Sequence, residues 1–141
     1  MNKLANSITA RMSLREPQSE SLDILAKVME LAQITKNTDP ATALDSIKSC
    51  YPSVIDFERN FPSLCFSLAT GVGKTRLMGA FISYLFLTRA SRHFFVLAPN
   101  LTIYEKLISD FSPESPKYVF KGIPEFATNR PVIVTGDNFA Q

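Results

Sequence analysis

The sequence predicts an α/β fold in which helices cover a mostly parallel sheet. Three observations lead to this prediction. After about residue 60, apolar runs typical of buried strands alternate with segments of helical periodicity. A glycine-containing turn joins the first apolar run to the helical segment that follows it. The composition, 45% hydrophobic and 20% charged over 141 residues, is that of an ordinary globular domain.

Two helices are predicted ahead of the sheet. Residues 13–16 (Ser-Leu-Arg-Glu) match a capping box, and Pro17 suits the first turn of the helix that follows. The apolar face of that helix consists of Leu22, Leu25, Ala26, Met29 and Ala32. A second helix is predicted over residues 41–50. Together these segments predict an N-terminal helical domain over residues 1–58.

The predicted sheet contains four strands, which are residues 61–69, 94–98, 118–121 and 132–135. A largely buried helix over residues 75–89 connects the first two strands and completes a right-handed βαβ unit. A second helix is predicted over residues 101–111, ending before Pro113. These elements predict a second domain over residues 59–141.

Residues 68–75 (Leu-Ala-Thr-Gly-Val-Gly-Lys-Thr) have the composition and the position of a phosphate-binding loop. Gly71 and Gly73 permit positive φ, so that successive N–H groups can point at a polyphosphate. A helix beginning at about Lys74 adds the positive end of its dipole at the same place. Lys74 would neutralise the β and γ phosphates, and the Thr75 hydroxyl would bind Mg²⁺. The loop therefore predicts binding of ATP or GTP with magnesium.

The candidate residues of this loop divide by role. Lys74 and Thr75 are the candidate catalytic residues, and Thr75 is the candidate magnesium ligand. The nucleotide-binding candidates are Thr70, Gly71, Val72, Gly73, Lys74 and Thr75. Leu68 stands where the general motif has its first glycine, so an ordinary glycine turn after a strand is the alternative.

Residues 12–22 (Met-Ser-Leu-Arg-Glu-Pro-Gln-Ser-Glu-Ser-Leu) resemble the glutamine motif that precedes the phosphate-binding loop in superfamily 2 helicases. The resemblance implies that Gln18 reads adenine, because an amide donates and accepts hydrogen bonds at once. It also implies a preference for ATP over GTP and a role for Arg15 in supporting the base or its loop. A surface glutamine at a helix start is the alternative for Gln18 taken alone.

Residues 95–108 (Phe-Val-Leu-Ala-Pro-Asn-Leu-Thr-Ile-Tyr-Glu-Lys-Leu-Ile) resemble the helicase segment that contacts the nucleic-acid backbone. With the loop, they resemble the restriction (Res) subunit of type III restriction enzymes and related DEAD/DEAH-type helicases, in which an apolar residue at Leu68 is usual. Residues 132–139 (Val-Ile-Val-Thr-Gly-Asp-Asn-Phe) resemble the approach to a second backbone contact. The implied nucleic-acid contacts are Pro99, Asn100, Thr102, Lys106, Thr135 and Gly136.

The resemblance runs from about residue 11 to the end of the sequence and implies the front half of one RecA-like motor domain. It implies an ATP-dependent DNA helicase or translocase that contacts duplex backbone, with ATP and magnesium as cofactors and a modification (Mod) subunit as partner. The sequence contains no Asp-Glu-x-His box, and the Thr-Gly-Asp-Asn context of Asp137 favours a turn. We therefore expect an N-terminal piece of a longer protein that hydrolyses ATP. Whether a nuclease domain follows is open.

Two functions remain open at this stage. One is the ATP-binding part of such a motor, and the other is a nucleotide-binding or interaction module that is catalytically inactive on its own. A small P-loop kinase is disfavoured because the sequence shows no lid rich in arginine. No apolar run reaches about 18 residues and no signal peptide is recognisable, so a cytoplasmic protein with no membrane partner is expected. Cys50 and Cys65 are expected to be small buried residues.

Overall fold

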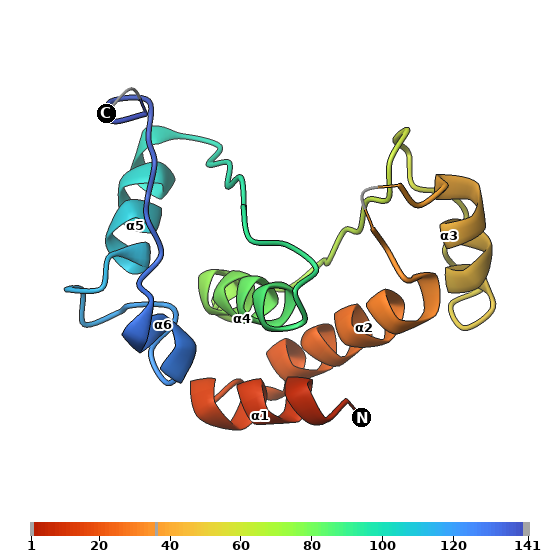
Figure 1. Cartoon of the computed structure of the whole chain (residues 1–141), viewed down its shortest axis with the longest axis horizontal. Helices are drawn as coiled ribbons and strands as arrows, with labels where there is room; N and C mark the ends of the chain where they lie inside the picture. Colours follow the sequence, from red (N-terminus) through yellow and green to blue (C-terminus); the bar gives the residue numbers. More distant parts are fainter. Residues whose placement is uncertain (1, 36, 140–141) are drawn as a thin grey trace.

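The computed structural model describes residues 2–35 and 37–139, and these residues form a helical structure (Figure 1). The ends of the two predicted domains at Met1, Ala140 and Gln141 lie outside the described residues. The helices are α1 (Lys3–Met12), α2 (Glu16–Ala32), α3 (Pro40–Lys48), α4 (Lys74–Leu87), α5 (Leu101–Phe111) and α6 (Pro124–Thr128).

The predicted α/β fold with a RecA-like sheet is wrong, because no described residue lies in a strand. Residues 62–69, 93–98 and 130–135 have no regular structure, and residues 119–122 form a turn. A strand needs ladder hydrogen bonds to a neighbouring strand. Residues 62–69 and 93–98 each lie in a connection between two helices, and residues 130–135 follow α6 (Figure 1). No ladder forms among the described residues.

The helix predictions were more successful than the strand predictions. The structure confirms the helices expected near residues 17–32, 41–50, 75–89 and 101–111. The capping box predicted at residues 13–16 is not formed, because Ser13 has a left-handed φ of 50° and ends α1. Arg15 instead occupies the position before α2. Helices α1 and α6 were not predicted, although the Asn2 side chain caps α1 by accepting from the Leu4 and Ala5 N–H groups.

A first apolar core holds α1, α2 and α4 together at the centre of Figure 1. It includes Ile8 and Met12 of α1 and Leu22 of α2, all nearly inaccessible to solvent. A second core joins the far end of α2 to α3 through Val28, Ala43 and Ile47, among others. The first core contains residues on both sides of residue 58, so the candidate loop is anchored to the N-terminal helices.

Close backbone approaches attach the C-terminal part of the chain to this core. A Cβ added to Gly79 of α4 would lie 3.0 Å from Val119 Cβ, which shows how near the 119–122 turn comes to α4. The Val119 N–H donates to the Asp110 carbonyl of α5 at 2.8 Å. Phe120 packs against Phe111 and Phe126, with ring centroids 5.5 and 4.4 Å apart. The end of α5 is therefore fixed beside α4.

Two further features of the surface bear on the sequence predictions. Cys50 and Cys65 are both exposed, so the expectation that they are buried is wrong. Among the described residues, no helix has the length and apolar character required to cross a bilayer.

Candidate functional site

The candidate loop lies between the extended segment 62–69 and the start of α4. Gly71 has a φ of 81° and Gly73, the residue before α4, has a φ of 90°. These left-handed conformations are readily adopted by glycine and cost other residues energy. Lys74 is exposed at the first position of α4, and Thr75 behind it is half-buried. The glycine positions therefore set the local course of the backbone.

Gln18, which is 2% exposed, joins the start of α2 to this loop. Its Nε2 donates to the carbonyl oxygens of Val72 and Gly73, both at 2.9 Å. Its Oε1 accepts from the Arg15 N–H at 2.8 Å. Gly73 makes the contact possible, because a Cβ at that position would lie 2.6 Å from Gln18 Nε2. Gln18 is therefore a support of the loop.

The carbonyl directions determine where the loop presents its donors. In a trans peptide the C=O and the following N–H point in opposite directions. Since the carbonyls of Val72 and Gly73 face Gln18, the N–H groups of Gly73 and Lys74 face away from it. No described side chain caps α4, so the N–H groups of its first turn are available to an anion. Open space surrounds Gly71. This donor set fits a polyphosphate.

Adenine recognition by Gln18 stays a prediction. Both polar atoms of the side chain are engaged within the protein, and a base could be read only if the amide left these bonds or shared them. Arg15 is exposed, and its backbone N–H is the group that contacts Gln18. No local sequence pattern indicates the bond between Gln18 and the loop, since the partners are 54 and 55 residues apart.

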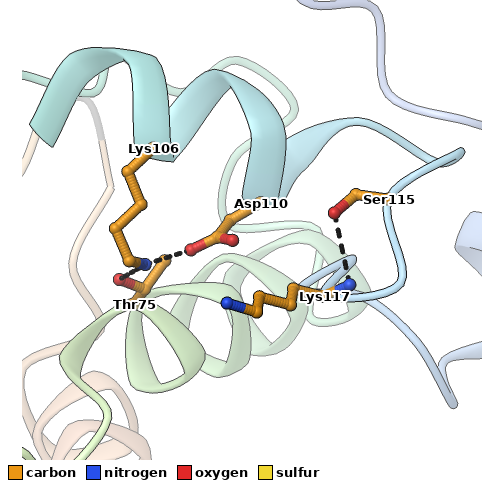
Figure 2. Close-up of polar contacts among 5 residues, drawn as sticks. All are labelled: Thr75, Lys106, Asp110, Ser115 and Lys117. Atoms are coloured by element: carbon orange, nitrogen blue, oxygen red, sulfur yellow. Dashed lines mark hydrogen bonds and ion pairs between the residues drawn. The ribbon is translucent and has the colours of Figure 1, made fainter. Parts of the chain in front are cut away.

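Figure 2 shows three side chains gathered at the first turn of α4. Lys106 Nζ of α5 lies 3.4 Å from Thr75 Oγ1 and forms an ion pair with the Asp110 carboxylate. The Asp110 side chain is 7% exposed, whereas that of Lys106 is 51% exposed. Lys117 lies nearby in the same view, and its backbone N–H donates to Ser115 Oγ at 3.2 Å. Asp110 was missed by the sequence analysis.

The oxygen donors at this point fit magnesium, which prefers hard oxygen ligands and retains several waters and phosphate oxygens. Thr75 Oγ1 and the Asp110 carboxylate both contact the same ammonium group. Within residues 2–35 and 37–139 there is no cluster of three or more His, Cys, Asp and Glu side chains that could hold a metal alone. A metal here would therefore need further ligands from outside the protein, such as phosphate oxygens or water.

The candidate nucleic-acid contacts lie on two separate segments. Asn100 caps α5, its Oδ1 accepting from the Ile103 N–H at 3.0 Å, and Pro99 and Thr102 beside it are exposed. The Thr135 N–H donates to Asn138 Oδ1 at 2.6 Å in the second segment, where Gly136 is exposed. No hydrogen bond between described residues joins the two segments. Lys106 is the candidate that lies at the loop.

An apolar groove of about 380 Å³ follows α2 and the segment that leads into the loop. Its lining includes Pro17, Ile24, Ile47, Tyr51 and Leu68, with Glu20 as its charged side chain. A carboxylate and the lack of lysine or arginine in this lining disfavour an anion. This groove is therefore not a candidate for binding phosphate.

The family comparison agrees with the resemblance noted in the sequence. A family model described as type III restriction enzyme, res subunit, matches residues 11–139. The match includes Gln18, the whole loop, α5 and the turn at Thr135. Comparison with curated proteins and with solved structures gave no match.

Proposed function

The chain belongs to the family of type III restriction enzyme Res subunits, and from this premise we propose that it binds ATP with magnesium through residues 70–75. The observation that carries the proposal is the loop itself. Gln18 holds two of its carbonyls, and the N–H groups of the same peptides face the opposite side at an uncapped helix start. This arrangement suits the β and γ phosphates of a nucleotide.

Each loop residue has a distinct part in the proposal. Gly71 and Gly73 give the backbone its course, while the Lys74 ammonium neutralises phosphate charge. The Thr75 hydroxyl supplies one ligand to magnesium, which when bound offsets the charge that develops on the transferred phosphoryl group. Arg15 and Gln18 are proposed to favour adenine over guanine, by analogy with the glutamine motif. The site would then prefer ATP to GTP.

The wider function is proposed from the family. A restriction subunit of this kind would use ATP to move on duplex DNA, with backbone contacts from Pro99, Asn100, Thr102, Lys106, Thr135 and Gly136. We propose a modification subunit as its protein partner and the cytoplasm as its location. These contacts would position DNA without reading its sequence.

The alternative is a nucleotide-binding or interaction module that does not catalyse hydrolysis by itself. The sequence favours this alternative for the chain alone, because it has no Asp-Glu-x-His box. Asp137 lies exposed in a turn, where its N–H donates to Thr135 Oγ1 at 3.3 Å. Positioned water and compensation of transition-state charge are needed for phosphoryl transfer in addition to a phosphate site. We therefore propose that these residues on their own bind ATP and do not hydrolyse it.

Calorimetric titration with Mg-ATP and Mg-GTP tests the proposal directly. We expect saturable binding of Mg-ATP, weaker binding of Mg-GTP, and loss of binding in Lys74→Ala. Gln18→Ala should reduce binding and the discrimination between the two nucleotides. Circular dichroism of each variant shows whether the helices are retained. A folded wild-type chain that binds neither nucleotide would overturn the nucleotide-binding proposal.

A further inference from the structure

In the structure, the ammonium group of Lys106 lies at the position proposed for magnesium. Lys106 Nζ contacts Thr75 Oγ1 at 3.4 Å on one side and the Asp110 carboxylate on the other (Figure 2). Lys106 and Asp110 are four residues apart on α5, which places them on the same helix face. Thr75 comes from α4, so the three side chains join the loop helix to α5.

An ammonium group and a magnesium ion cannot occupy this position together. Magnesium binds oxygen at about 2.0–2.1 Å, so an ion held by Thr75 would lie next to Lys106 Nζ in the observed arrangement. Two adjacent positive charges repel each other strongly when they are partly shielded from water. Binding of a magnesium nucleotide at Thr75 therefore requires Lys106 to move away.

The two members of the ion pair differ in their freedom to move. The Lys106 side chain is 51% exposed and has a flexible stem, so it can turn into solvent. The Asp110 side chain is 7% exposed, and the carbonyl of the same residue accepts from the Val119 N–H at 2.8 Å. A buried carboxylate that loses its counter-charge is costly. Asp110 would thus attract the cation that replaces the ammonium.

We infer that Lys106 and Asp110 form a cation-exchange pair at Thr75. The Lys106 ammonium holds the position first, and a magnesium–nucleotide complex replaces it against the Asp110 carboxylate. Asp110 acts on the metal directly or through bound water, which makes it a positioning residue for magnesium. The exchange also frees Lys106 for the contact with the DNA backbone that is proposed above. This inference rests on the proposed nucleotide binding and adds a carboxylate that the sequence motif does not contain.

The magnesium requirement of nucleotide binding provides the test. Lys106→Met removes the competing charge and keeps the apolar stem, so the Mg²⁺ concentration at half-maximal ATP binding should fall by at least about fivefold, a typical coupling between linked sites. Asp110→Asn should raise that concentration by a similar factor. Lys106→Arg should restore a requirement close to the wild-type one, and Lys121→Met serves as an exposed control.

The outcomes separate the inference from the proposal on which it rests. If wild type binds Mg-ATP and Lys106→Met has an unchanged or higher Mg²⁺ requirement, the exchange pair is wrong and the nucleotide site stands. If no variant and no wild-type chain binds nucleotide while all are folded, both proposals fail. Should Asp110→Asn not fold, comparison of Lys106→Met with Lys106→Arg decides the question alone.

Discussion

Gln18 fills the space left by the missing side chain of Gly73. The amide nitrogen lies 2.6 Å from the point where a Cβ of that residue would be, and it donates to the carbonyl of the same residue. Gly71, two positions earlier, has a similar φ but no atom within 4 Å of its Cβ position. Gly71 is therefore required only for its backbone conformation, whereas Gly73 is required both for its conformation and for the space that Gln18 occupies.

Gly73→Ala should destabilise the chain more than Gly71→Ala. Both substitutions place alanine at a positive φ, which costs on the order of 1–2 kcal/mol. Only the change at Gly73 also displaces Gln18 from two hydrogen bonds. We expect an additional loss of about 2 kcal/mol in the free energy of unfolding for Gly73→Ala, since each of the two hydrogen bonds contributes about 1 kcal/mol net. Urea denaturation of both variants measures the difference.

The double variant Gly73→Ala with Gln18→Ala serves as the control. Once Gln18 is shortened, the alanine at position 73 no longer meets its amide, so the two effects should be less than additive. Strict additivity would show that Gln18 does not support the loop.

Helices α2 to α5 could be predicted because their determinants lie within the segments themselves. Pro17 in a first turn, Asp39 before Pro40 and Asn100 before α5 all mark helix starts that the structure contains. The apolar run 94–98 has no such local determinant, since a strand is stabilised by a partner strand. Without one, the segment is an extended connection between α4 and α5.

Asp39 at the start of α3 gives a prediction about pH. Its Oδ2 accepts from the Thr42 N–H at 2.9 Å and from the Thr42 hydroxyl at 2.8 Å. The bond from the Thr42 backbone, followed by that from its hydroxyl, lowers the pKa of Asp39. Because the pKa is lower in the folded state, the ionised Asp39 stabilises the folded chain at pH values above its unfolded pKa of about 3.9. This stabilisation is lost as the pH falls through the folded-state pKa.

The melting temperature of Asp39→Ala should accordingly lie below that of wild type at pH 7, and the gap should narrow as pH falls below about 4. Asp39→Asn is the matched control, because asparagine caps helices as well as aspartate but does not titrate. The gap between Asp39→Asn and Asp39→Ala should stay constant with pH. Thermal scans between pH 7 and pH 3 measure both gaps. A gap between wild type and Asp39→Ala that is independent of pH would contradict the assignment of this pKa.

Arg76 links α4 to the end of α1. Its Nη1 donates to the Met12 carbonyl in the last turn of α1, where the helix leaves carbonyl groups without internal partners. Arg76→Met keeps most of the apolar stem and removes the donor. We expect a loss of about 1 kcal/mol in the free energy of unfolding, which is below the usual contribution of a charge-assisted bond because Arg76 is exposed. Chemical denaturation checks this value, and an unchanged midpoint would show that α1 is held by its apolar face alone.

The candidate site depends on contacts that no single segment determines. Positive φ at Gly71 and Gly73 and a helix start at Lys74 were predictable from eight consecutive residues. The contact of Lys106 with Thr75 spans 31 residues and results from the docking of α5 beside α4 through Val119. Local sequence can therefore predict the backbone conformation of the loop and the start of its helix. It cannot identify the side chains that surround the loop.

The three extended segments leave large apolar side chains on the surface. Phe95 is 89% exposed, Leu97 is 75% exposed and Val132 is 87% exposed. The same residues were assigned to buried strands because apolar runs normally lie inside a protein. Apolar surface of this kind is removed from water when chains associate, which contributes roughly 25 cal/mol per Å² of buried area. Chains with this arrangement should therefore associate with one another at high protein concentration.

We predict that the purified chain self-associates with increasing concentration, and that Phe95→Ser combined with Leu97→Ser reduces this association. The double variant should melt at nearly the wild-type temperature, because neither side chain belongs to the two apolar cores. Leu22→Ser, in the first core, is the contrasting variant and should lower the melting temperature. Sedimentation velocity over a concentration series measures the association. A double variant that unfolds at a much lower temperature than wild type would mean that residues 94–98 are buried in the folded chain, and the exposed course of this segment would be wrong.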